Sequence, residues 1–239
     1  MMPRSPYIVF LILLMFFVIS FITNIIGPLM PDIIGSFNLS LTLVALIPFA
    51  FFIAYGVMSI PAGMLLLKFK EKHLIVSAFI VIFFGAILLA LLPSYLTALF
   101  SFFIIGCGMA VLQVVINPLL RVTGGEEHFA MYAVFAQLVF GFASFLSPLV
   151  YTQLASETFF SADYPFLQNL STFLIPKELP WISLYFLFSV ISLFMILILA
   201  FSKFPKIKLK SNEKLGALAT HIKLFKNKQI RLFFLGMIC

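Results

Sequence analysis

The sequence predicts an all-α polytopic membrane protein, and three observations carry this prediction. Of its 239 residues, 63% are hydrophobic and only 10% are charged, whereas a soluble globular chain carries about 25% charged residues. Several apolar runs reach the roughly 20 residues that a helix needs to cross a bilayer. A backbone in lipid must also satisfy its own hydrogen bonds, and no alternating pattern typical of a β-barrel is present.

Six membrane spans can be delimited along the chain, in order, at about Tyr7–Met30, Leu41–Leu67, Leu74–Leu92, Tyr95–Leu120, Phe129–Gln153 and Trp181–Phe201. The first apolar run is too long for the core of a signal peptide and ends in no small-residue cleavage site, so we interpret it as a membrane helix. A last apolar stretch follows Arg231 and is too short to span. We therefore predict three parts: a six-helix domain over 1–202, a basic cytoplasmic linker over 203–230, and the start of a truncated seventh helix over 231–239.

The basic residues predict the orientation of these spans. Fourteen of the fifteen Lys and Arg residues fall on one side of the predicted spans, and only Lys177 falls on the other. Basic residues mark the cytoplasmic side of a membrane protein. We expect a cytoplasmic N-terminus, and we attribute the net charge of +7 to membrane topology rather than to nucleic-acid binding.

The interior of the predicted spans carries no carboxylate and no histidine, since these residues lie in loops or at helix ends. This pattern argues against an intramembrane enzyme and against a proton relay in this part of the chain. The two cysteines have no metal-ligand spacing. We therefore expect neither an enzyme nor a cofactor or metal site.

Polar side chains in the middle of the spans are mostly amides. Counted from the charged residues that bound the spans, Gln113 and Asn24 lie roughly 12 Å deep and Gln137 roughly 13 Å deep, in a hydrocarbon core about 30 Å thick. Tyr55 lies midway along the second span. These groups either hold helices together through interhelical hydrogen bonds or line a central cavity that suits a ligand rich in hydroxyl groups.

The loop after the second span, "PAGMLLLKFKEKHLIV", resembles the G-x-L-x-D-[RK]-x-G-[RK]-[RK] loop of the major facilitator superfamily. The residues that keep this pattern are Gly63, Leu65, Lys68 and Lys72. Leu67 stands in place of the aspartate and Lys70 in place of the second glycine. The match is therefore partial.

Two later spans resemble one family of that superfamily, the fucose/galactose/glucose permeases. The fourth span, "GMAVLQVVINPLL", is similar to G-x-x-x-L-[EQ]-x-x-x-N-P-[YL], and the fifth, "FAQLVFGFASFLSP", carries Gln137 at the family's A-Q pair. Fucose-type members have an aspartate, a glutamate and an asparagine where this chain has Asn24, Gln113 and Phe140. Sugar binding by amides is compatible with these differences, but proton coupling through this half does not follow.

The resemblance implies the N-terminal six-helix bundle of a 12-helix major facilitator fold, truncated in helix 7. It implies a secondary active hexose transporter of the bacterial inner membrane, coupled to a cation such as a proton or sodium, that works with a C-terminal half by alternating access. A uniporter, a transporter of another small molecule and a non-transporting membrane subunit remain alternatives. The candidate substrate-binding residues are Asn24, Tyr55, Gln113, Asn117, Gln137 and Phe140, and the candidate cytoplasmic gating residues are Gly63, Lys68, Lys72 and Arg121.

Overall fold

Six stretches of helix long and apolar enough to cross a membrane make up the described part of the chain. The structure, a computed structural model, describes residues 5–155 and 179–204. Within these residues the prediction of an all-helical membrane domain is confirmed. The predicted start of a seventh helix and nearly all of the predicted linker lie outside the described residues.

The helices begin and end close to the predicted positions. They are α1 (Pro6–Asn24), α2 (Ile26–Phe37), α3 (Leu41–Lys68), α4 (Glu71–Leu91), α5 (Tyr95–Gly124), α6 (Phe129–Ala155) and α9 (Ser183–Phe201), with short 3₁₀ turns at Glu126–His128 and Pro180–Ile182. Serine explains three of the starts, because a serine at the N-cap satisfies a backbone N–H of the first turn. Ser5, Ser40 and Ser94 each accept a hydrogen bond from the backbone N–H three residues later.

The first span is longer than predicted. We expected it to end near Met30, but after an interruption at Ile25 it continues as α2 to Phe37. Pro28 is the third residue of α2, where its missing N–H would have no intrahelical partner in any case, so proline is tolerated there. The helix ends at Asn38, which adopts the left-handed conformation (φ 50°) that asparagine tolerates better than most residues.

Several charged residues expected in loops lie inside helices, among them Lys68 at the end of α3 and Glu71 and Lys72 at the start of α4. Asp32 is an exposed residue of α2, and Arg121 lies in the last turn of α5, which continues to Gly124.

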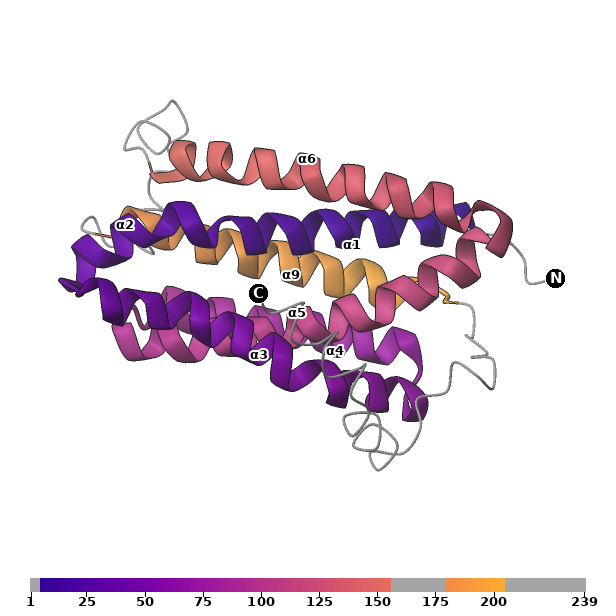
Figure 1. The fold of residues 1–239 in the computed structure, drawn as a ribbon, viewed down its shortest axis with the longest axis horizontal. Coiled ribbons are helices and arrows are strands. Elements are labelled where there is room, and N and C mark those ends of the chain that lie inside the picture. Colours follow the sequence, from indigo (N-terminus) through magenta and orange to yellow (C-terminus); the bar gives the residue numbers. More distant parts are fainter. Residues whose placement is uncertain (1–4, 156–178, 205–239) are drawn as a thin grey trace, which may run out of the picture. The chain divides into compact units, whose positions relative to one another are not determined.

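Helices α1 and α5 form the centre of the bundle, and α3 and α6 lie at its edges. The most hydropathic window is 67% buried for the α1–α2 span and 61% buried for α5, against 22% for α3 and 17% for the span that contains α6. Helix α5 packs on α3, α4 and α1, while α6 packs mainly on α1 and α9 mainly on α4. Figure 1 shows α6 running alongside α1, with α3, α4 and α5 grouped together.

Two glycines let α5 approach its neighbours at backbone distance. A β-carbon at Gly106 would lie 2.5 Å from the carbonyl oxygen of Phe51 on α3, and one at Gly108 would lie 2.8 Å from that of Ala78 on α4. Small residues are the usual means of close helix packing in membranes, where van der Waals contact replaces the hydrophobic effect between helices. These two glycines therefore hold α3, α5 and α4 together.

Aromatic side chains fix the start of α9 to the C-terminal end of the first span. Trp181 is buried and donates from Nε1 to Ser36 Oγ at 2.9 Å, and its ring makes an edge contact with that of Phe37. The contacts continue inward through Tyr185 and Phe188. Because the indole is buried with its N–H satisfied, this contact joins α2 to the 3₁₀ turn before α9 without the cost of an orphan donor.

We predict that Gly106→Ala destabilises the bundle. In an unobstructed helix the change from glycine to alanine stabilises by about 0.5–1 kcal/mol, but here the new methyl group meets a backbone carbonyl that cannot rotate away. Such overpacking typically costs about 1–3 kcal/mol, so the melting temperature of the purified protein in detergent should fall. Gly141→Ala is the matched control, since a β-carbon there meets open space. Equal melting temperatures for the two variants would contradict this assignment.

Candidate functional site

Asn24 lies where the first span is interrupted. It is the last residue of α1, and α2 begins after Ile25. Pro28 has no N–H to donate to the Asn24 carbonyl four residues earlier, and its ring would crowd that carbonyl in a regular helix. The regular hydrogen-bond series resumes with Leu29 N–H, which donates to the Ile25 carbonyl at 3.2 Å. The predicted amide is therefore placed at a proline-induced interruption of the span.

The Asn24 side chain is tied to α6 through Ser20. Asn24 Nδ2 donates to the Ser20 carbonyl oxygen at 2.9 Å and to Ser20 Oγ at 3.1 Å. Ser20 Oγ in turn donates to the backbone carbonyl of Phe140 at 2.6 Å. Ser20 is fully buried, whereas Asn24 and Phe140 are half-buried. Phe140 thus takes part through its backbone, which no reading of its side chain could have predicted.

Gln113 and Asn117 lie on one stripe of α5 together with Gly106, because the separations of seven and four residues return to nearly the same face of a helix. Exposure rises along this stripe, from buried Gly106 to half-buried Gln113 and exposed Asn117. The Asn117 side chain donates from Nδ2 to the Gln113 backbone carbonyl at 3.0 Å. Its amide is thereby anchored to its own helix just before Pro118.

Tyr55 and Thr23 face each other across the boundary between α3 and α1. The Tyr55 side chain is half-buried, and its hydroxyl lies beside that of Thr23. Even so, Thr23 Oγ1 is buried and makes no hydrogen bond of ordinary geometry within the described part of the chain. The Tyr55 ring also packs on that of Phe51, with 5.2 Å between ring centroids. Tyr55 is therefore partly a packing residue, with a hydroxyl that a ligand could engage.

Gln137 lies on the exposed face of α6, whose buried face includes Ala136 and Ala143. Within the described part of the chain Gln137 makes no hydrogen bond to Asn24 or Gln113, so its expected place beside them stays a prediction. Sequence reasoning missed Ser20 and Thr23. The available signal was position: Ser20 precedes Asn24 by four residues, the spacing at which helical side chains meet.

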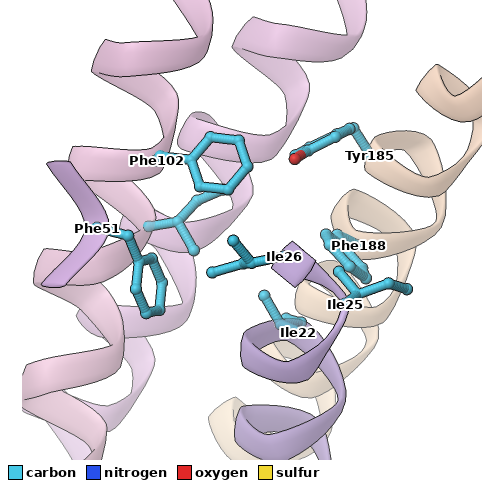
Figure 2. Close-up of a pocket in the computed structure, with 8 residues that line it drawn as sticks. Ile22, Ile25, Ile26, Phe51, Phe102, Tyr185 and Phe188 are labelled. Atoms are coloured by element: carbon cyan, nitrogen blue, oxygen red, sulfur yellow. The ribbon is translucent and has the colours of Figure 1, made fainter. Parts of the chain in front are cut away.

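A small cavity lies beside the helix interruption, but it is not a sugar site. Its lining residues are Ile22, Ile25, Ile26, Phe51, Phe102, Ile105, Tyr185 and Phe188 (Figure 2). Its volume is about 10 Å³, close to the minimum for one water, whereas sites for small molecules span about 300–1,000 Å³. Figure 2 shows the Tyr185 hydroxyl pointing among apolar side chains. The cavity is a packing gap among α1, α2, α3, α5 and α9, and none of the candidate binding residues lines it.

The candidate gating residues lie at one end of the bundle. Lys72 Nζ donates to the carbonyl oxygens of Ala200 at 2.6 Å and Ser202 at 2.8 Å, at the end of α9. Arg121 pairs with Glu126 at 3.3 Å. Gly63 is buried in α3 and Lys68 is its exposed last residue. A gating role for these four residues stays a prediction.

Six helices long and apolar enough to span a membrane, with amides on the central pair, define a polytopic membrane protein. The sequence model of the Major Facilitator Superfamily matches residues 12–239. The chain therefore belongs to the Major Facilitator Superfamily, a superfamily of transporters rather than enzymes.

Two curated relatives are sugar transporters. The chain is 38% identical over 117 residues to the glucose/galactose transporter of Brucella abortus biovar 1 (strain 9-941), a match that covers 48% of this chain and 28% of that protein. It is 32% identical over 134 residues to the L-fucose-proton symporter of Escherichia coli (strain K12), covering 54% of this chain and 31% of that protein. These are the permeases that the fourth and fifth spans resemble.

Solved structures share the fold. The major facilitator transporter FucP in its outward conformation superimposes with a TM-score of 0.68 at 24% identity, over 91% of this chain and 55% of FucP. A bacterial homologue of the human lysosomal transporter Spinster, in an inward-facing conformation, gives a TM-score of 0.71 at 16% identity, over 94% of this chain and 50% of that one. The chain thus spans about half the length of these transporters.

We predict that Lys72→Met lowers the melting temperature of the purified protein. The substitution removes two charge-assisted hydrogen bonds that join the start of α4 to the end of α9, and a cation at a helix C-terminus contributes up to about 1 kcal/mol at an exposed position. Lys72→Arg should restore most of the stability. Lys70→Met is the control in the same loop, since Lys70 is exposed and its side chain makes no capping bond to α4. Equal effects at positions 70 and 72 would show that only the charge of the loop matters.

Proposed function

We propose that this chain is the N-terminal half of a secondary active hexose transporter of the bacterial inner membrane, with its N-terminus in the cytoplasm. The observation that carries the proposal is the set of neutral amides on the two central helices, Asn24 on α1 and Gln113 and Asn117 on α5. Amides both donate and accept hydrogen bonds, which suits the hydroxyl groups of a sugar. The sugar-transporting relatives support the same substrate class.

The mechanism would be alternating access. Two halves rock about a site near the middle of the membrane, which opens in turn to each side. This half contributes the amide stripe of α5 and the interrupted first span, and a C-terminal half completes the cavity. The rise in exposure from Gln113 to Asn117 suits a stripe that leads from the bound sugar toward the cytoplasm.

Transport by the full-length protein tests the function. Membrane vesicles that contain it should take up labelled glucose, galactose or fucose above the level of vesicles without it. With cation coupling, uptake should fall when either a protonophore or the removal of sodium collapses the driving gradient. Uptake that changes with neither the proton gradient nor the sodium gradient would identify a uniporter. A lack of uptake of all three hexoses would refute the substrate class.

The contribution of Gln113 can be measured separately. We expect Gln113→Ala to raise the apparent KM for the hexose about tenfold, the effect of losing roughly 1.4 kcal/mol of hydrogen bonding, with little change in the amount of folded protein. Ser59→Ala is the control, because Ser59 is exposed on α3 and its hydroxyl donates only to the Gly56 carbonyl of its own helix. Unchanged kinetics in Gln113→Ala would mean that this amide only joins helices.

A further inference from the structure

The Ser20 hydroxyl has only one way to satisfy both of its neighbours. Its oxygen lies 2.6 Å from the Phe140 carbonyl oxygen, which can only accept, so the Ser20 proton must point there. Toward Asn24, 3.1 Å away, the Ser20 oxygen is therefore an acceptor. The direction of this hydrogen-bond chain follows from atom types alone.

The Asn24 amide orientation follows from this chain. Its nearest partners on α1 are two acceptors, the Ser20 carbonyl oxygen at 2.9 Å and Ser20 Oγ at 3.1 Å. The nitrogen edge must face them, because the reversed amide would place Oδ1 against two oxygens. The amide nitrogen thus donates to two atoms of Ser20, and Oδ1 is the atom of the half-buried side chain that is left to meet a ligand.

We propose that Ser20 is a positioning residue that holds Asn24 as an obligate hydrogen-bond acceptor, so that a hydroxyl of the bound hexose must donate to Asn24 Oδ1. The inference rests on the proposed function for the identity of the ligand, but the Ser20–Asn24 link stands on the geometry of α1 and α6. The Ser20–Asn24 link turns an amide that could bind either a hydrogen-bond donor or an acceptor into one that binds only a donor. Asn117 is anchored in the same sense, from Nδ2 to a carbonyl one turn earlier, but through one bond rather than two.

The link between the two residues is tested without any sugar. A double-mutant cycle of Ser20→Ala and Asn24→Ala, read as melting temperature in detergent, should show that the double variant loses less stability than the sum of the single variants. Ser192→Ala supplies the control cycle with Asn24→Ala. Ser192 is as fully buried as Ser20, but its hydroxyl on α9 makes no hydrogen bond within the described residues, so that cycle should be additive. Additivity in the Ser20 cycle would overturn the proposal.

The acceptor role is tested with sugar analogues on the full-length transporter. At the hexose position that meets Asn24, replacement of the hydroxyl by hydrogen or by fluorine should weaken binding equally, by about tenfold, because fluorine cannot donate. Asn24→Ala should abolish the preference for hydroxyl at that position and at no other. In Ser20→Ala only the backbone carbonyl of residue 20 still holds the amide nitrogen, so the amide turns more readily and the fluoro analogue should regain part of its affinity over the deoxy analogue. Ser20→Thr, which keeps the hydroxyl, should behave like the unmodified protein.

The outcomes distinguish a failure of the proposed hexose transport from a failure of the proposed role of Ser20. If the unmodified protein takes up no hexose, the proposed function fails, while the stability cycle still decides whether Ser20 holds Asn24. If hexose is carried and the fluoro analogue binds better than the deoxy analogue at the Asn24-dependent position of the unmodified protein, Asn24 donates to the sugar and the proposal is wrong. Where Ser20→Ala fails to fold, Ser20→Cys, which offers only a weak donor and acceptor, replaces it in both experiments.

Discussion

The close approach of α5 to α3 and α4 is the contact on which the arrangement of the bundle depends. Gly106 and Gly108 face opposite sides of α5, since two residues turn a helix by about 200°, and each removes a side chain from a contact with a neighbouring backbone carbonyl. The pair therefore fixes the rotation of α5 about its own axis as well as its position. Because Gln113 and Asn117 share the face of Gly106, that rotation also determines where the amide stripe points. The glycine contacts of α5 therefore do more than pack the helices, because they also orient the candidate site.

A second constraint is that backbone polar groups inside a membrane must find partners. Pro28 and Pro118 each remove an N–H from a spanning helix, which takes the intrahelical partner from the carbonyl four residues earlier. Near each proline an asparagine side chain is anchored to a different carbonyl, that of Ser20 for Asn24 and that of Gln113 for Asn117. Irregular backbone at membrane depth is tolerated where it is buried in protein or lines a cavity, and the half-buried Asn24 fits that condition. The same two asparagines are the candidate ligand contacts. Anchoring to the helix and ligand recognition therefore use opposite edges of one side chain.

Hydropathy alone was sufficient to locate all six spans, because length and apolar composition decide which segments can cross a bilayer. The extension of the first span as α2 was not predicted, because Pro28 and Pro31 look like a helix end unless the position of Pro28 in a new first turn is known. The amides were found from their depth, but their orientation was not. Ser20 attracts no notice in a sequence, and the acceptor that fixes its proton is a backbone carbonyl of Phe140 on a helix 120 residues away. A hydrogen-bond partner supplied by the backbone cannot be recognised from the amino-acid sequence, because every residue carries the same carbonyl group.

The surroundings of Asn24 give a physical reason for an amide at a position where fucose-type members carry an acid. The Ser20 carbonyl oxygen beside it can only accept a hydrogen bond, and the Ser20 hydroxyl has its proton committed to Phe140. A carboxylate in this place would face two oxygens and would be disfavoured by repulsion and by its partial burial, so it would fit only while protonated. An amide supplies the two donors at every pH. The geometry at position 24 is therefore independent of protonation, and any coupling of the proposed transporter to a proton gradient has to act through another group.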